Sequence, residues 1–353
     1  LKEQIKIEAG DVSGDASYGY ILSHKPNASV KAANHLLANG QNVYWTNSEF
    51  GSSGSQYKAG SIVVENGRNT REAIKKVAQQ YGLDFQGISD QPGVELYKIE
   101  RPKVGLYKSW VSNMDEGWTR WVLENYAFEV DTLHDSNLIE NDLSQYHSII
   151  IPDKRPSRIL NGHKPGNMPE ESTGGMGLEG ALAQKNFVNG GGTLLAFDSA
   201  SDFVINQFGL PVENVTEGLS NTEFFIPGSL IRAKVSIDYP LAYGMQPEIA
   251  ASISHSRAFE IEKIDREGEG GKKDIKKAPA PPIDVPVKYA KDDLLMSGWA
   301  LGEDKYLAGK AAMMNVQYGA GNIVLYGFRP QFRGQPRGTY KLIFNPIFMS
   351  TMD

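Results

Sequence analysis

The 353-residue sequence contains no cysteine, which excludes disulfide bonds, metal sites built on thiolates and a cysteine nucleophile. It has no apolar run near the roughly 18 residues that a transmembrane helix needs, and no recognisable signal peptide. It also lacks an excess of positive charge, since 36 Lys and Arg against 42 Asp and Glu give a net charge of −6. That balance argues against a general nucleic-acid binder. The chain begins at Leu1 without a methionine, and we expect it to be a processed or truncated piece of a longer protein.

Hydrophobic residues make up 40% and charged residues 22% of the chain, a composition typical of a globular protein with a substantial core. The length allows two or three domains. We expect residues 1–17 to form a polar loop or tail and residues 18–101 to form a small α/β domain. Apolar periodicity in the second segment predicts the order β-α-β-β-α-β, which favours a ferredoxin-like domain. Its predicted strands are Tyr18–Ser23, Asn42–Thr46, Ser61–Glu65 and Val94–Ile99.

Residues 102–353 have a different pattern, in which buried strands alternate with helices. This alternation predicts a parallel sheet. The predicted strands are Val104–Tyr107, Glu129–Leu133, Ile149–Ile151, Thr193–Phe197 and Ile323–Phe328. Residues 220–320 are rich in strand signals, and residues 260–287 combine charges with prolines. We interpret the latter as an exposed loop within the domain.

Polar side chains follow several of the predicted parallel strands, where the carboxyl ends of the strands would meet at one edge. Residues 327–339 contain three arginines at spacings of four, and guanidinium groups suit carboxylates or phosphates. The alternative is that the arginines pair with neighbouring acids and only stabilise this edge. The predicted ligand-binding residues are Arg329, Arg333, Arg337, Asp115, Glu116 and Asp153. Under the first interpretation, Arg329→Ala and Arg333→Ala should weaken carboxylate binding without unfolding the chain.

The segment from Leu194 to Asp202 runs from a strand through a tight turn into a helix, which is where a hydrolase nucleophile would lie. Asp198 and Ser199 occupy that turn. A serine nucleophile needs a base, and His134, His147, His163 and His255 are the candidates. None has a recognisable context, so the alternative is that Asp198 and Ser199 cap the following helix. The histidine spacings do not indicate a metal site, and we predict none.

Four long segments resemble the C-terminal, non-catalytic region of large bacterial zinc-carboxypeptidase-like proteins. They are PKVGLYKSWVSNMDEGWTRWVLENYAFEVDTL (102–133), GGTLLAFDSASDFVINQFGLP (191–211), TEFFIPGSLIRA (222–233) and YGFRPQFRGQPRGTYKLIFN (326–345). The segment NASVKAANHLLANGQNVYW (27–45) also fits. The resemblance implies a class I glutamine-amidotransferase-like domain with a flavodoxin-like parallel sheet, following the small α/β domain.

In that family an upstream peptidase domain carries zinc, and none of its ligand motif is present here. The amidotransferase cysteine is also absent, so no cofactor is expected in this chain. The resemblance implies a secreted or periplasmic parent protein that acts as a zinc metallo-carboxypeptidase through its upstream domain. The function that follows for this chain is an accessory region for substrate positioning, peptide or carboxylate binding, or homo-oligomerisation, with the upstream peptidase domain as partner. A hydrolase using Asp198 or Ser199, and a purely structural assembly domain, are the alternatives.

Overall fold

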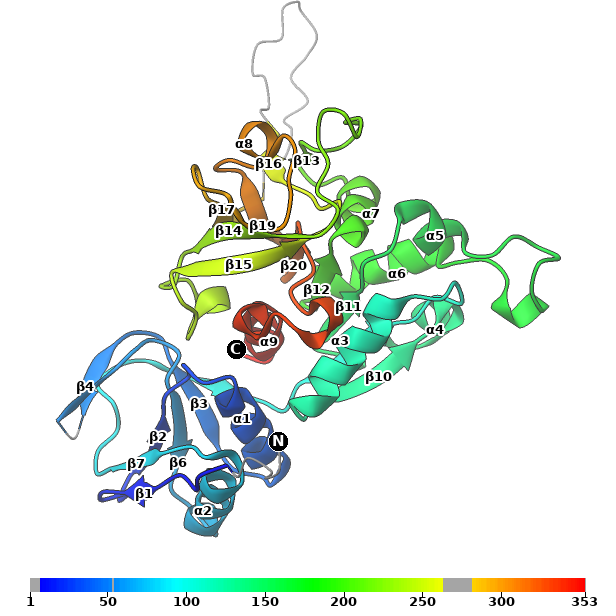
Figure 1. The fold of residues 1–353 in the computed structure, drawn as a ribbon. Helices are drawn as coiled ribbons and strands as arrows, with labels where there is room; N and C mark the ends of the chain where they lie inside the picture. Colours follow the sequence, from blue (N-terminus) through cyan, green and yellow to red (C-terminus); the bar gives the residue numbers. More distant parts are fainter. Residues whose placement is uncertain (1–6, 53, 263–280, 353) are drawn as a thin grey trace, which may run out of the picture.

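A computed structural model describes residues 7–52, 54–262 and 281–352. Its two main sheets use separate parts of the chain, residues 12–99 and residues 103–326 (Figure 1). A short hairpin of β4 (Phe50–Ser52) and β5 (Ser55–Tyr57) forms a separate two-stranded sheet, and its Phe50 belongs to one hydrophobic cluster with Ile21 and Val63 of the first sheet.

The first sheet has the antiparallel ladder of a ferredoxin-like domain. Its elements are β2 (Gly19–Leu22), α1 (Ala28–Ala38), β3 (Val43–Thr46), β6 (Ile62–Glu65), α2 (Thr70–Tyr81) and β7 (Phe85–Ile88). The strands lie in the order β7-β2-β6-β3, and each neighbouring pair is antiparallel. Numbered along the chain, this order is 4-1-3-2. The predicted ferredoxin-like fold is therefore confirmed.

The prediction for the last strand of this unit is wrong. The fourth strand is β7, whereas β8 (Leu96–Ile99) adds to the opposite edge beside β3. The sequence of β7 is FQGI, and its Gln and Gly weaken the strand signal. The predicted loop at residues 1–17 is wrong at Val12–Ser13, where β1 pairs with β7. Residues 1–6 of that prediction lie outside the described part of the chain.

The second sheet begins with five parallel strands. They are β9 (Lys103–Tyr107), β10 (Glu129–Leu133), β11 (Ser148–Ile151), β12 (Thr193–Phe197) and β20 (Gly321–Tyr326). Their spatial order, β10-β9-β11-β12-β20, is 2-1-3-4-5 along the chain. This is the flavodoxin-like order, so the predicted fold class is confirmed.

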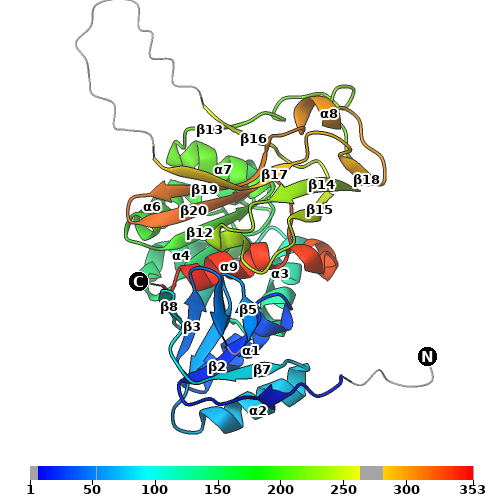
Figure 2. The same ribbon diagram turned by 90° about the vertical axis from the view of Figure 1, so that its left-hand side faces the viewer.

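Helices cover both faces of the parallel strands (Figure 2). One face packs against α3 (Met114–Asn125) and α9 (Lys341–Met349), and the other packs against α4 (Asp135–Glu140), α6 (Gly177–Asn189) and α7 (Ser199–Phe208). The short helix α5 (Pro156–Asn161) lies beside α7. Both faces of the four inner strands are therefore buried, which explains their nearly continuous apolar sequences. The edge strand β10 has the sequence EVDTL and is largely exposed or half-buried.

Antiparallel strands extend this sheet beyond β20, in the order β19-β17-β14-β15. The strands are β14 (Ser229–Val235), β15 (Glu248–Ile253), β17 (Ile283–Tyr289) and β19 (Ala311–Tyr318), with β13 (Val212–Asn214), β16 (Phe259–Ile261), β18 (Leu295–Ser297) and α8 (Glu303–Tyr306) beside them. The predicted loop at residues 260–287 is wrong at its ends, where β16 and β17 pair with β19. Residues 263–280 of that prediction lie outside the described part of the chain.

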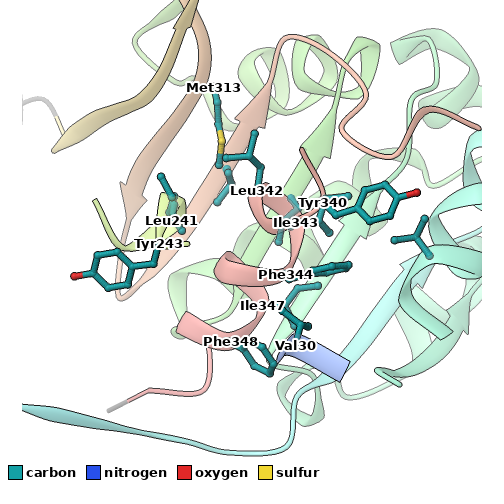
Figure 3. Packing of buried hydrophobic residues seen from close by; sticks show 14 of the residues in the cluster. Val30, Leu241, Tyr243, Met313, Tyr340, Leu342, Ile343, Phe344, Ile347 and Phe348 are labelled. Carbon is teal, nitrogen blue, oxygen red and sulfur yellow. The ribbon is translucent and has the colours of Figure 1, made fainter. Parts of the chain in front are cut away.

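The two sheets share one hydrophobic core, centred on α9 (Figure 3). Phe348 on α9 contacts Trp45 of β3 edge to face, with ring centroids 5.7 Å apart. Tyr243 contacts the same indole at 6.1 Å. Buried polar contacts accompany these rings, since His24 Nε2 lies 3.0 Å from Asn345 Oδ1. The ferredoxin-like unit is therefore packed firmly against the second sheet.

Gly60 lies at the contact between the two sheets, beside Tyr243. We expect its replacement to lower the stability of the protein measurably. Gly60 has φ = +79°, and a Cβ atom at this position would lie 2.5 Å from the Cβ atom of Tyr243. We expect Gly60→Ala to lower the free energy of unfolding by about 2–3 kcal/mol, because it adds overpacking to a left-handed backbone. Gly54→Ala is the matched control, since Gly54 has φ = +76° but open space around it. Urea unfolding should show that Gly54→Ala lowers the free energy of unfolding by only about 1 kcal/mol. Equal losses in the two variants would contradict the packing argument.

Candidate functional site

The carboxyl ends of the parallel strands surround a cavity of about 660 Å³. It is lined by residues that lie one to three positions after the ends of β11, β12 and β20, namely Asp153, Asp198 and Arg329. The position is the one at which open α/β sheets bind ligands. The antiparallel part of the sheet supplies a further wall through Ser254, His255 and Arg257.

Asp198 occupies the tight turn between β12 and α7. Its backbone has φ = 49° and ψ = −114°, a conformation that is uncommon for a residue with a side chain. Ser201 stabilises this turn, because its Oγ donates to the carbonyl of Ala196 at 2.8 Å and lies 3.0 Å from the carbonyl oxygen of Tyr326. A strained residue between a strand and a helix is the geometry of a nucleophile elbow. Here that position carries a carboxylate.

The Asp198 carboxylate is fully engaged within the protein. Arg257 Nη1 donates to Oδ1 at 2.8 Å, and Ser256 Oγ donates to Oδ2 at 3.2 Å. Arg329 Nε lies 3.6 Å from Oδ2. Asp198 is only 1% exposed. Burial and the neighbouring charge of Asp153 raise the pKa of Asp198, and the charges of Arg257 and Arg329 oppose this rise. These contacts leave no accessible oxygen for attack on a substrate.

The backbone N–H after the elbow residue is also occupied. In elbow hydrolases this group helps to form the oxyanion hole. Ser199 N instead donates to Asp153 Oδ1 at 3.1 Å. An internal carboxylate therefore lies where a reaction's oxyanion would bind. The alternative prediction is that these residues cap α7. Asp198 does occupy the N-cap position of α7, but its side chain makes no capping hydrogen bond.

Arg329 is the predicted arginine that reaches the site. Its Nη1 lies 3.3 Å from Asp115 Oδ2 and 3.6 Å from Asp153 Oδ2, and its guanidinium stacks on Phe332 at 4.4 Å from the ring centroid. The structure therefore brings Arg329, Asp115 and Asp153 together. They pair with one another, as in the alternative interpretation that the arginines pair with neighbouring acids. Because the Arg329 side chain is 11% exposed, Arg329→Ala would leave buried acids unpaired. It is therefore a poor probe of ligand binding.

Three other predicted residues do not join this cluster. Arg333 and Arg337 are exposed, and Arg333 lies over the ring of Phe332. Glu116 pairs with Arg120 on the same helix through Oε1 and faces a smaller adjoining cavity. The regular spacing of the arginines did not predict a common location, because the segment forms two short 3₁₀ turns, Phe332–Gly334 and Arg337–Thr339.

Sequence reasoning missed the main cation of the site. Arg257 pairs with Asp198 and also with Asp202, whose Oδ2 lies 2.9 Å from Arg257 Nε. Arg257 follows an antiparallel strand, and no motif marks that position. His255 is the one candidate base among the described residues that lines the cavity; it is exposed and has φ = 54°. His147, by contrast, accepts a hydrogen bond from Lys103 N at 3.1 Å, away from the cavity.

Within the described residues, no group of three or more His, Asp or Glu side chains is placed to hold a metal ion. No helix in the same part of the chain is both long and apolar enough to cross a bilayer.

The fold and this site define a flavodoxin-like α/β domain with an aspartate at the turn between β12 and α7. No family model matches the sequence, and no curated protein matches it. Several solved structures are similar in part. A ThuA-like protein from Bacteroides uniformis has 9% identity and a TM-score of 0.38, covering 69% of this chain and 89% of its own.

Two further solved structures are similar in part. A GMP synthase component from Thermoplasma acidophilum has 11% identity and a TM-score of 0.39, covering 70% of this chain and 94% of its own. A structure of PurLQS from Thermotoga maritima has 16% identity and a TM-score of 0.43, covering 71% of this chain and 97% of the matched chain.

Proposed function

We propose that this chain is the accessory, ligand-binding region of a zinc-carboxypeptidase-like protein, and that its cavity binds a carboxylate-bearing ligand such as a peptide C-terminus. The resemblance of the sequence supports the parent protein, with a secreted or periplasmic location and an upstream peptidase domain as partner. The main support for the binding role is that several cationic side chains line the cavity and have no acidic partner among the described residues.

Lys154, Arg155 and Arg158 line the cavity, and no Asp or Glu oxygen among the described residues lies within 4.0 Å of their charged nitrogens. Arg155 and Arg158 are exposed, at the mouth of the cavity. The deeper arginines differ, because Arg257 and Arg329 are already paired with acids. The cavity therefore offers guanidinium groups that have no acidic partner among the described residues, although Arg158 Nη1 donates to the carbonyl of Gly162 at 3.5 Å. Guanidinium groups suit the planar, bidentate geometry of a carboxylate.

Binding is favoured over hydrolysis by the state of the elbow. The Asp198 carboxylate is buried and paired, and the Ser199 N–H is occupied by Asp153. A hydrolase would need both groups available to substrate. The hydrolase alternative makes its own prediction, which is ester or amide turnover that Ser199→Ala abolishes.

The binding role is tested with N-acetyl-dialanine, which has a free carboxylate, and its C-terminal amide. We expect calorimetry to detect the acid and not the amide. Replacing Arg155 and Arg158 together by alanine should weaken binding of the acid about 30-fold or more, since each lost charged hydrogen bond contributes roughly 1 kcal/mol or more and about 1.4 kcal/mol is tenfold in affinity. Because both side chains are exposed, the free energy of unfolding should change by less than about 0.5 kcal/mol.

Lys164→Ala is the control, because this exposed lysine lies in the neighbouring loop and does not line the cavity. Equal affinity for the acid and the amide, or unchanged affinity in the double variant, would contradict the proposed function.

A further inference from the structure

A second cavity, of about 220 Å³, adjoins the first at the point where the strand order of the parallel sheet reverses. It lies beyond β9 and β11, which are strands 1 and 3 of the 2-1-3-4-5 order. Tyr107 and Lys108 line it from the end of β9, and Pro152 lines it from the end of β11. This switch point is a preferred ligand position in flavodoxin-like sheets. The two cavities share Ser112, Asn113 and Lys154, so one ligand can extend through both.

Trp110 gives this cavity a flat apolar wall. The indole is 39% exposed, although most tryptophans are largely buried. One face stacks on His134, with ring centroids 4.0 Å apart and planes within 7° of parallel. This contact fixes the orientation of the indole while leaving part of it open to a ligand. An exposed, immobilised aromatic plane suits the face of a ring.

Glu116 supplies a hydrogen-bond acceptor in the same cavity. The residue is 7% exposed, and Oε1 receives Arg120 Nε at 3.0 Å. The second oxygen, Oε2, has no hydrogen-bond partner among the described residues. An unpartnered oxygen on a largely buried carboxylate is costly unless a ligand or water donates to it. A hydroxyl group of a ligand is a suitable donor.

Lys108 and Lys154 add positive charge to this wall. Neither amine has an acidic oxygen within 4.0 Å in the part of the chain that the structure describes. Lys154 Nζ is held by the carbonyl of Val111, where the two cavities join. An anionic group placed at this junction would face Lys154 and the free arginines of the larger cavity.

We propose that the small cavity binds the ring of an acidic sugar, with the ring on Trp110, a hydroxyl group donating to Glu116 Oε2, and the carboxylate toward Lys154. The volume is below the roughly 300–1,000 Å³ of sites for whole drug-sized ligands, so it fits one ring of a larger molecule. This inference rests on the proposed function, because it takes the carboxylate site as given and names the group that carries the carboxylate.

The experiment measures binding of D-glucuronate, D-glucose, acetate and N-acetyl-dialanine to the full chain by calorimetry. We expect D-glucuronate to bind at least tenfold more tightly than D-glucose or acetate. Trp110→Leu should weaken glucuronate binding about tenfold and leave the affinity for N-acetyl-dialanine within twofold. Trp121→Leu is the matched control, because Trp121 is 46% exposed on α3 and does not line either cavity. It should change neither affinity.

A second variant guards against local misfolding around Trp110. Lys108→Ala replaces an exposed side chain and should also weaken glucuronate binding. If glucuronate binds no better than acetate, or if Trp110→Leu and Trp121→Leu behave alike, the sugar inference is overturned while binding of N-acetyl-dialanine still supports the proposed function. If adenosine monophosphate binds at this cavity and glucuronate does not, a planar base is the ring and the inference is also overturned. If neither glucuronate nor N-acetyl-dialanine binds, the proposed function fails as well.

Discussion

Replacing Arg257 by methionine should lower the free energy of unfolding by about 3–5 kcal/mol, the usual effect of removing one partner from a buried ion pair. Arg257 donates at 2.8 Å to Asp198 and at 2.9 Å to Asp202. Its side chain is 18% exposed, and that of Asp198 is 1% exposed. Methionine retains much of the side-chain packing, so the measured loss reports mainly on the two carboxylates that lose this guanidinium. Asp198 would keep Ser256 and the longer contact to Arg329, and Asp202 would keep Asn214. Urea unfolding at pH 7 measures it.

Two further variants separate charge pairing from packing. The double variant Asp198→Asn with Arg257→Met should be less destabilised than the sum of the single variants, because the asparagine removes one of the two charges that lose the guanidinium of Arg257. Arg155→Met is the matched control, since Arg155 is exposed and has no acidic partner among the described residues. Its effect should stay within about 0.5 kcal/mol. A loss below about 1 kcal/mol for Arg257→Met, far under the usual effect, would show that Arg257 does not hold the elbow in place.

Acid should weaken the contact between the two sheets by acting on His24. The ring is 2% exposed, contacts Trp45 at 5.0 Å between centroids, and lies 3.0 Å from Asn345 Oδ1. Burial, with the nearby charge of Lys341, lowers the pKa of His24 from 6.5 to about 3, although the Asn345 hydrogen bond opposes this. The folded protein therefore keeps His24 neutral at a pH where the unfolded chain protonates it.

The direction in which stability changes with pH follows from this difference in bound protons. Between about pH 6.5 and pH 3 the unfolded state binds more protons, so stability rises with pH over that range. The contribution of neutral His24 is complete above about pH 6.5 and is lost as the pH falls. Between about pH 7 and pH 4 the loss is about 3 kcal/mol, since each pKa unit corresponds to about 1.36 kcal/mol.

The measurement compares the wild-type chain with His24→Gln by urea unfolding at pH 7 and pH 4. Other groups titrate in both proteins, so the relevant quantity is the difference between their pH dependences. We expect the variant to lose about 3 kcal/mol less than the wild type. His255→Gln is the control for replacing a histidine by glutamine, because His255 is exposed and lines the cavity instead of the contact between the two sheets. The same pH dependence in the wild type and His24→Gln would contradict a neutral, buried His24.

Local patterns in the sequence determined the order and type of most elements. Apolar runs such as Ile149–Ile151 and Thr193–Phe197 fall within strands β11 and β12, because a strand covered on both faces needs apolar residues throughout. The same reasoning identified the turn at Asp198 before α7. It failed for β7, whose sequence FQGI has only two large apolar residues, and which is stabilised as a strand by pairing with β2.

The site itself depended mainly on tertiary structure. The sequence determined that no cysteine lies at the elbow and that acids and arginines follow the strand ends. Only the fold decided which of them meet: Arg257, 59 residues from Asp198, pairs with it, whereas Arg333 and Arg337 remain exposed. Likewise, only the fold placed Asp153 on the Ser199 N–H and left Glu116 facing a cavity. Such pairings join residues that are distant along the chain, and local periodicity carries no information about which side chains the strand order brings together.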